Sequence, residues 1–120
     1  TNSNTIIHNM NIMVKQIIKF FYSKINVAPG IYNPNFKCFY NSVHEAILKN
    51  EEFVVICFCL NKNNLFIHFI IYTPGVGFID NTLGDLSKQF SYHLHSIVLK
   101  KEFSSIKIIF NNCLKIKNLS

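Results

Sequence analysis

The sequence has no arginine, so all twelve of its basic residues are lysines. It therefore lacks the guanidinium fork that binds guanine or phosphate through two hydrogen bonds. The lysines are scattered, with Lys100 and Lys101 as the only adjacent pair, which is typical of a solvated surface. The net charge of +6 allows weak attraction to an acidic partner. The composition argues against a nucleic-acid-binding module, in which aromatic residues lie among basic ones.

Long hydrophobic runs and metal-binding cysteine spacings are also missing. No segment free of polar residues reaches the length of a transmembrane helix, and no signal peptide with a small-residue cleavage site is visible. Cys57 and Cys59 form a C-x-C pair without a C-x-x-C partner, which is a poor arrangement for zinc. We therefore expect four free thiols, Cys38 and Cys113 included, in a cytoplasmic protein with no metal, no cofactor and no membrane partner.

What the chain does contain is apolar and aromatic side chains, which make up 49% and 14% of its residues. This composition predicts one well-packed domain over residues 1–120 and argues against a disordered chain. The polar segments 1–9 and 111–120 are expected to be mobile ends. Asparagine, isoleucine, lysine and phenylalanine dominate, which is typical of codon bias in an AT-rich genome.

Hydrophobic periodicity predicts the helices and strands. Helical spacing occurs in 10–25, 38–50 and 85–99, strand-like runs occur in 53–60, 65–72, 77–81 and 104–110, and breakers mark 26–36 as a loop. The amphipathic helix 10–25 is expected to pack on the domain's own sheet rather than on a membrane or a partner helix. Three successive strands predict an antiparallel meander covered by helices, which is an α+β fold.

A candidate nucleophile, Cys38, opens one of the predicted helices. Pro34 keeps the approach to this helix extended, and Asn35 is a candidate cap. A thiol in the first helical turn faces backbone N–H groups and the positive end of the helix dipole, and both favour the thiolate. Asn41, one turn later, is a candidate for supporting the Cys38 backbone or the tautomer of a histidine. The alternative is that Cys38 is a small buried core residue.

His68 and Asp80 are the candidate partners of this cysteine. His68 interrupts the apolar run 65–72, and Asp80 lies on the next predicted strand. If these strands pair, the imidazole can reach the carboxylate, which completes a nucleophile, a base and a residue that orients the base. Two alternatives stay open. A core histidine is often satisfied by the backbone, and an aspartate often stabilises a turn.

Three short motifs resemble a known family. CFYNS at 38–42, the spacing from His68 to Asp80, and FIDNT at 78–82 resemble the Cys-His-Asp core of the transglutaminase-like branch of the papain-like superfamily. In that family a helix begins with C-x-x-N-[SA], a strand carries the histidine, and the next strand carries the aspartate. The residue two positions after the histidine is often aromatic there, whereas here it is Ile70.

The resemblance implies a papain-like or transglutaminase-like α+β core with helices on a small antiparallel sheet. It also implies catalytic roles for Cys38, His68 and Asp80, supported by Asn41 and Asn35. The implied function is thiol-dependent acyl transfer on a protein or peptide, as in a cysteine protease (a hydrolase), a deamidase or a transglutaminase. The alternative, favoured by the small size and the AT-rich composition, is a binding or inhibitor protein without catalysis, encoded by a phage or mobile element.

Overall fold

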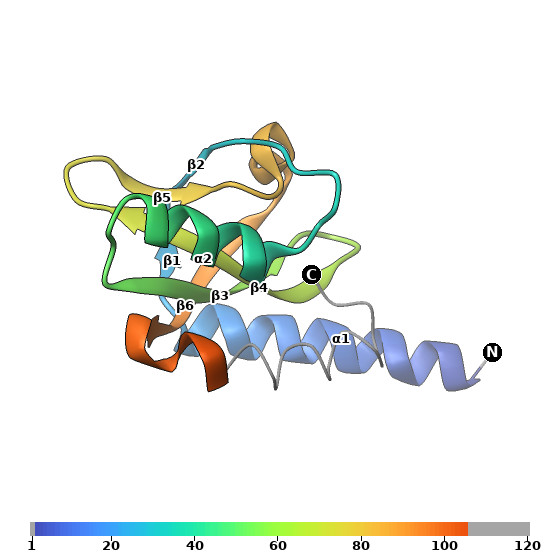
Figure 1. Cartoon of the computed structure of the whole chain (residues 1–120). Coiled ribbons are helices and arrows are strands. Elements are labelled where there is room, and N and C mark those ends of the chain that lie inside the picture. Colours follow the sequence, from blue (N-terminus) through green and yellow to red (C-terminus); the bar gives the residue numbers. More distant parts are fainter. Residues whose placement is uncertain (1, 106–120) are drawn as a thin grey trace.

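A computed structural model of the chain describes residues 2–105 (Figure 1). The elements in order are α1 (Asn2–Phe21), β1 (Lys24–Ile25), β2 (Val27–Pro29), α2 (Cys38–Leu48), β3 (Phe53–Leu60), β4 (Leu65–Thr73), β5 (Gly77–Asp80), the 3-10 helix η1 (Gly84–Gln89), β6 (Ser91–Leu99) and the 3-10 helix η2 (Lys100–Glu102). The α+β class, the bounds of β3 and the start of α2 confirm the predictions. Residues 106–120 lie outside the described residues, and with them Cys113, the predicted end 111–120 and most of the strand predicted over 104–110. Residues 103–105 are helical, so the start of that predicted strand is wrong.

The six strands form one mixed sheet in the order β1-β6-β3-β4-β5-β2. The predicted meander is confirmed, because β3 pairs antiparallel with β4, and β4 pairs antiparallel with β5, with Ile71 opposite Ile79. The prediction of an entirely antiparallel sheet is wrong, because β2 runs parallel to β5. β2 lies within 26–36, so the loop predicted there is also wrong in part. A three-residue edge strand ending in proline is too short to show a periodic pattern.

The prediction of a helix over 85–99 is wrong. The 3-10 helix η1 occupies the start of this segment, and β6 occupies the rest. β6 pairs antiparallel with β3, with a register shift between Ile56 and Cys57. The physical reason is that β3 is apolar on both faces and needs a hydrogen-bonded neighbour on each side, which β4 alone does not provide. The apolar residues of 86–98 have a spacing that fits a helix, but pairing with β3 makes the segment 91–99 a strand.

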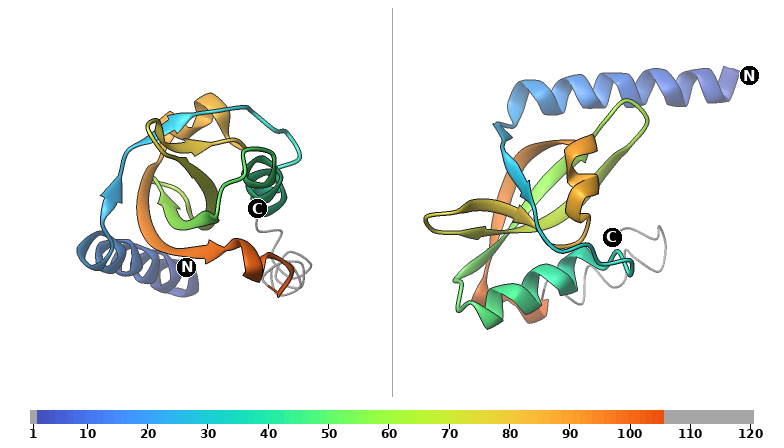
Figure 2. Two further views of the ribbon diagram at one scale, coloured as in Figure 1. Left: turned by 60° about the vertical axis from the view of Figure 1, so that its left-hand side comes forward. Right: turned by 90° about the horizontal axis from the view of Figure 1, so that it is seen from above.

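The sheet curls strongly and separates two apolar layers (Figure 2). On one face α2 packs against β4, where Phe39 contacts Phe69 edge to face with ring centroids 5.0 Å apart. The Ser42 hydroxyl donates to the Phe69 carbonyl oxygen at 2.9 Å, which ties the helix to the strand. The opposite face is enclosed by the curl, and it includes Cys57 and Tyr92. The curl therefore brings side chains of distant strands close together on one face.

The helix α1 begins at Asn2, so it is longer than the predicted helix 10–25 and includes most of the segment 1–9. Among its described side chains, at 9–21, only Ile18 is buried. The prediction that its apolar face packs on the sheet is therefore wrong. A hydrogen bond from Lys15 Nζ to the Lys62 carbonyl oxygen, 3.0 Å long, joins α1 to the β3–β4 turn. Within residues 2–105 no helix is both long and apolar enough to span a bilayer.

Candidate functional site

Cys38 is the first residue of α2, as the sequence predicts, and it is fully buried. The residue that precedes the helix is Lys37, and the helix start has no side-chain cap. The prediction that Asn35 caps α2 is therefore wrong. The Asn35 Oδ1 atom instead accepts a hydrogen bond from the Lys37 backbone N–H at 3.0 Å, which turns the chain just before the helix. The thiol thus sits at the positive end of the α2 dipole.

His68 and Asp80 form a buried pair on neighbouring strands, β4 and β5. The His68 Nε2 atom lies 2.8 Å from Asp80 Oδ2, and the two side chains are 1% and 0% exposed. β5 pairs with β4 only opposite residues 71–73. The imidazole therefore lies beyond the paired part of these strands, where the chain leaves the sheet after Asp80. The predicted contact between His68 and Asp80 is therefore present. The two alternatives were a histidine bonded only to the backbone and an aspartate that only stabilises a turn, and neither accounts for this contact.

Asp80 is the most densely hydrogen-bonded side chain of the site. Its Oδ1 atom accepts the backbone N–H groups of Thr82 and Leu83, both at 2.9 Å. Its Oδ2 atom accepts hydrogen bonds from the Tyr92 hydroxyl and from His68 Nε2. Four donors thus converge on one buried carboxylate, which fixes its position and favours its charged form.

Tyr92 is the site residue that the sequence analysis missed. It lies on β6, and two strands separate β6 from β5 in the sheet order, yet its hydroxyl reaches Asp80 because the sheet curls. Burial and the adjacent carboxylate raise the pKa of Tyr92, so it stays protonated and donates. The signal that could have indicated a strand over 91–99 was the presence of three residues that favour strands, Tyr92, Ile97 and Val98.

The Cys38 side chain lies against the His68 imidazole. The Cys38 thiol is close enough to help raise the pKa of His68. Asp80 occupies Nε2, so Nδ1 is the ring nitrogen left for the sulfur, and this buried nitrogen has no hydrogen-bond partner within residues 2–105. The three residues come from α2, β4 and β5, and they meet where the layer of α2 joins the enclosed face of the sheet. The contact between His68 and Asp80 is present, Cys38 lies beside the imidazole, and a catalytic role for the three residues stays a prediction.

The pKa values of the pair move in opposite directions. Burial acts to lower the pKa of His68, but hydrogen bonds with Asp80 and Cys38 outweigh it and raise the value from 6.5 to about 10. Burial acts to raise the pKa of Asp80, but the hydrogen bond and charge of His68, with Tyr92 and the Leu83 N–H, lower it overall. Both shifts favour an imidazolium held by a carboxylate.

Residues 30–37, which we call the 30–37 loop, lead from β2 into α2 and lie against the segment that follows β5. Four hydrogen bonds fix this loop to the segment after β5: Gly30 N–H to the Asp80 carbonyl, Ile31 N–H to Asn81 Oδ1, Asn33 N–H to the Thr82 carbonyl, and Asn33 Nδ2 to the Asn81 carbonyl, over 2.6–2.9 Å. The loop also approaches closely at Gly30, where an added Cβ would lie 2.1 Å from Asn81 Oδ1. These contacts hold the loop against the end of β5.

Asn41 and Asn35 are the predicted supporting residues. They help to hold the 30–37 loop in place, and in the described contacts they do not bond to the side chains of Cys38, His68 or Asp80. The Asn41 Nδ2 atom donates to Thr82 Oγ1 and to Asn35 Oδ1, both at 3.0 Å. Asn41 therefore ties the first turn of α2 to the residues after Asp80 and to the 30–37 loop. Its role is to hold the start of the helix beside β5.

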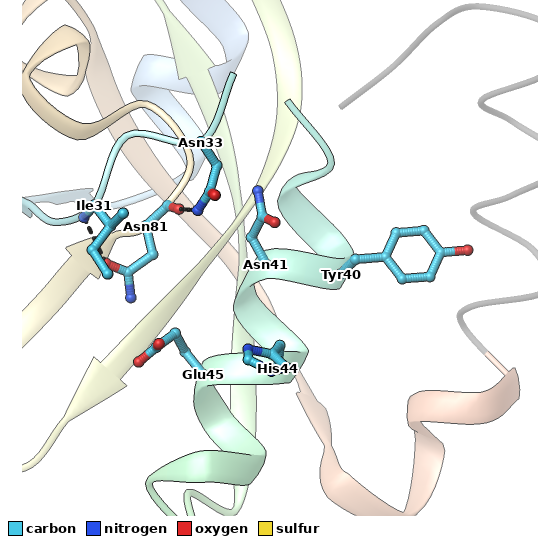
Figure 3. Close-up of a pocket in the computed structure, with 7 residues that line it drawn as sticks. All are labelled: Ile31, Asn33, Tyr40, Asn41, His44, Glu45 and Asn81. Atoms are coloured by element: carbon cyan, nitrogen blue, oxygen red, sulfur yellow. Dashed lines mark hydrogen bonds between the residues drawn. The ribbon is translucent and has the colours of Figure 1, made fainter. Parts of the chain in front are cut away.

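An open pocket of about 350 Å³ lies next to this network, on the outer side of α2 (Figure 3). Asn33 of the 30–37 loop and Asn81 line one side, and Asn41, His44 and Glu45 of α2 line the other. The lining is rich in amide groups, which can both donate and accept hydrogen bonds. This pocket therefore suits a polar group, and Cys38, His68 and Asp80 are not among the residues that line it.

Cys57, Cys59 and His93 are buried within the sheet. Burial raises the pKa values of the Cys57 and Cys59 thiols, which keeps them protonated on the central strand. His93 is buried, with Nδ1 2.9 Å from the Tyr22 carbonyl oxygen, while His95 is exposed. Among the described residues, no three His, Cys, Asp or Glu side chains form a group that could hold a metal ion.

Comparison of this chain with family profiles, with curated proteins and with solved structures finds no match. Membership of the papain-like superfamily therefore stays a prediction from the three motifs. The function of the site is argued below from the positions of its own residues.

The pKa shifts predict how stability depends on pH. The stabilisation from protonated His68 is fully present below its unfolded pKa of 6.5 and is lost as the pH rises through about 10. The lowered pKa of Asp80 acts in the opposite sense, so its stabilisation is present above the unfolded value of 3.8 and is lost as the pH falls through the folded one.

We therefore expect the free energy of unfolding to decline between pH 6.5 and about pH 10 in the wild type. His68→Gln, which has no titrating group, should show a flatter profile over this range. Urea unfolding at several pH values measures both. Parallel profiles for the two proteins would contradict a protonated His68 in the folded state.

Proposed function

We propose that this protein is a thiol-dependent acyl-transfer enzyme that acts on an amide or ester of a protein or peptide. The observation that carries the proposal is the arrangement of Cys38 at a helix start, His68 against its sulfur, and Asp80 2.8 Å from the far ring nitrogen. These are the positions of a nucleophile, a base and the residue that orients the base. A papain-like or transglutaminase-like origin of this core is part of the proposal.

In the proposed reaction, Cys38 and His68 form a thiolate–imidazolium pair, in which His68 Nδ1 already holds the proton of the thiol, and the thiolate sulfur attacks the carbonyl carbon of the substrate. The backbone N–H of Cys38 contributes to stabilising the oxyanion at the helix start. His68 returns the proton to the departing amine or alcohol, which leaves an acyl group on the sulfur. Water or an amine then takes the acyl group, so hydrolysis, deamidation and transfer share the same first step.

Asp80 and Tyr92 serve as positioning residues in this scheme. Asp80 accepts the N–H of His68 Nε2, which leaves Nδ1 as the nitrogen directed at Cys38. Tyr92 and the N–H groups of Thr82 and Leu83 keep the carboxylate from rotating away. The site is thus preorganised by hydrogen bonds from three different segments.

Substrate access requires local opening, because Cys38 is 0% exposed, and the 30–37 loop, which leads directly into Cys38, is the segment proposed to move. Most side chains of this loop are themselves exposed, and it is held largely by hydrogen bonds rather than by apolar burial. Such segments open at lower free energy than a core strand does. The proposal therefore includes a loop that opens locally while the sheet stays folded.

The second candidate function is a binding or inhibitor protein without catalysis. The complete burial of Cys38, which packs in one apolar cluster with Phe39 and Phe69, favours it. In that case the His68–Asp80 pair only stabilises the fold. The reactivity of the thiol separates the two functions.

We expect Cys38 to react with iodoacetamide faster than Cys57 and Cys59 at neutral pH. Its alkylation needs only local opening of the 30–37 loop, whereas the strand thiols need unfolding of β3, and burial raises their pKa values. Brief alkylation followed by peptide mapping, in a Cys113→Ser background, measures the three rates.

Asn41→Ala is the matched variant for this experiment. It removes the hydrogen bonds to Thr82 and Asn35, so Cys38 labelling should accelerate several-fold while labelling of Cys57 and Cys59 stays unchanged. Equal labelling of all three thiols, or labelling led by Cys59, would count against an activated Cys38 and favour the binding protein.

A further inference from the structure

The polar pocket beside α2 combines one carboxylate with several amide groups. It has a volume of about 350 Å³ and is lined by Ile31, Asn33, Tyr40, Asn41, His44, Glu45 and Asn81. These residues come from three segments, which are the 30–37 loop, α2 and the turn after β5 (Figure 3). A pocket of this size can hold a small ligand or the end of a chain. The pocket is therefore a candidate binding site, and its lining indicates what it would bind.

Asn81 presents a fixed hydrogen-bond donor to this pocket. Its side chain is anchored, because Oδ1 accepts the Ile31 backbone N–H at 2.9 Å, and its backbone carbonyl accepts a hydrogen bond from Asn33 Nδ2 at 2.6 Å. Asn81 is 6% exposed, and in the described contacts its Nδ2 atom donates to no other group. A largely buried amide nitrogen needs an acceptor. A ligand with a carbonyl oxygen would supply one.

Glu45 brings a negative charge to the wall of the pocket that α2 forms. Its side chain is 21% exposed, and it is the only acidic residue among those that line the pocket. Lys49 Nζ lies 3.7 Å from Glu45 Oε2, which is a surface ion pair of small stability, so the cation of a ligand can replace it. Figure 3 shows the Asn81 amide nitrogen and the Glu45 carboxylate directed at the same space. The pocket thus offers one neutral donor and one anionic acceptor to the same ligand.

An ammonium group next to a carbonyl group complements this donor and this acceptor. The first residue of a peptide has that combination, because its α-amino group is one carbon away from its carbonyl and is mostly protonated at pH 7. The side chain of a lysine or an arginine has the cation without a neighbouring acceptor, and a C-terminal carboxylate would be repelled by Glu45. Ile31, which is 59% exposed, adds an apolar surface for the first side chain of the peptide.

We infer that this pocket binds the N-terminal residue of a peptide or protein. Glu45 accepts hydrogen bonds from the α-ammonium group, and Asn81 Nδ2 donates to the first carbonyl oxygen. The inference goes beyond the proposed acyl transfer, because it names the end of the peptide that is held, and it applies equally to a protein that binds without catalysis. Asn41 lines the pocket and lies in the first turn of α2, so the bound N-terminus lies beside the helix that begins with Cys38.

Fluorescence polarisation at neutral pH tests the inference with the full chain. The probe is a short peptide of alanine, serine and glycine with a free N-terminus and a fluorophore at its C-terminus. The wild type should bind this peptide, and N-acetylation of the peptide should weaken binding by at least about tenfold, because the charge held by Glu45 is lost. An N-acetylated peptide with one internal lysine has the same net charge as the free peptide, and it should bind as weakly as the acetylated one.

Glu45→Gln should lower the affinity for the free peptide by at least about tenfold and leave binding of the acetylated peptide unchanged. Glu52→Gln is the matched control, because Glu52 is exposed and does not line the pocket, so its affinity should equal that of the wild type. Circular dichroism should show that both variants keep the fold. Three outcomes overturn the inference: no binding of the free peptide, equal binding of the free and the lysine-containing peptides, or unchanged binding in Glu45→Gln. Because the measurement is binding, a failure of the proposed chemistry would leave its result unaffected.

Discussion

Asp80→Ala should destabilise the protein by about 3–5 kcal/mol, because it leaves one member of a buried ion pair without its partner. His68 loses the carboxylate 2.8 Å from Nε2, and the Tyr92 hydroxyl and two backbone N–H groups lose their acceptor. Each unsatisfied buried donor adds its own desolvation cost. Urea unfolding at neutral pH gives the difference in the free energy of unfolding.

Asp80→Asn separates the role in chemistry from the role in folding. The amide keeps an acceptor for the backbone N–H groups, so we expect a smaller loss of about 1–3 kcal/mol. It no longer favours a protonated imidazole or the tautomer that directs Nδ1 at Cys38, so the alkylation rate of Cys38 should fall by at least about tenfold. The measurement is the rate against pH for the wild type, Asp80→Asn and His68→Ala.

Asp85→Asn provides the matched control for these variants. The Asp85 side chain is 90% exposed and its ion pair with Lys88 spans 3.8 Å at the surface, so neither stability nor thiol reactivity should change measurably. Identical rate profiles for the wild type, Asp80→Asn and His68→Ala would defeat the triad hypothesis. The binding protein would then be the better account of the site.

Cys38→Ala should abolish acyl-enzyme formation. With an activated ester such as p-nitrophenyl acetate, the wild type should release a burst of nitrophenolate close to one equivalent, and mass spectrometry should place the acetyl group on Cys38. The variant should show no burst, and His68→Ala should slow the burst by about a hundredfold or more, because the base is lost. These are the largest effects on activity that the proposed mechanism predicts.

Cys57→Ala is the matched control for the loss of one buried thiol. Cys57 is as buried as Cys38, and its sulfur bonds to the His68 carbonyl oxygen rather than to the imidazole. Its burst should match that of the wild type once melting curves show that the protein is folded. An unchanged burst in Cys38→Ala, or acetylation spread over several residues, would contradict the mechanism.

The sequence by itself determined the local parts of the site. Cys38 at a helix start, His68 within an apolar strand, and Asp80 on the following strand are signals carried by a few neighbouring residues. A tight turn forces the two strands to pair, so the contact between His68 and Asp80 followed from the chain alone. The sequence also predicted the central strand β3, because a short run of apolar residues without a charge is typical of a strand that is buried on both faces.

Only the tertiary structure decided which distant segments meet. Tyr92 reaches Asp80 because the curled sheet brings β6 over β5, and the helical spacing of 86–98 concealed the strand that carries it. The burial of Cys38 follows from its packing in one apolar cluster with Val54, Phe69 and Val98 of three different strands, and local patterns do not encode contacts of such sequence separation. The exposure of Phe20 and Phe21 likewise depends on which edge of α1 the sheet occupies. Amphipathicity predicts that a helix has an apolar face, and the packing of the whole domain determines what covers it.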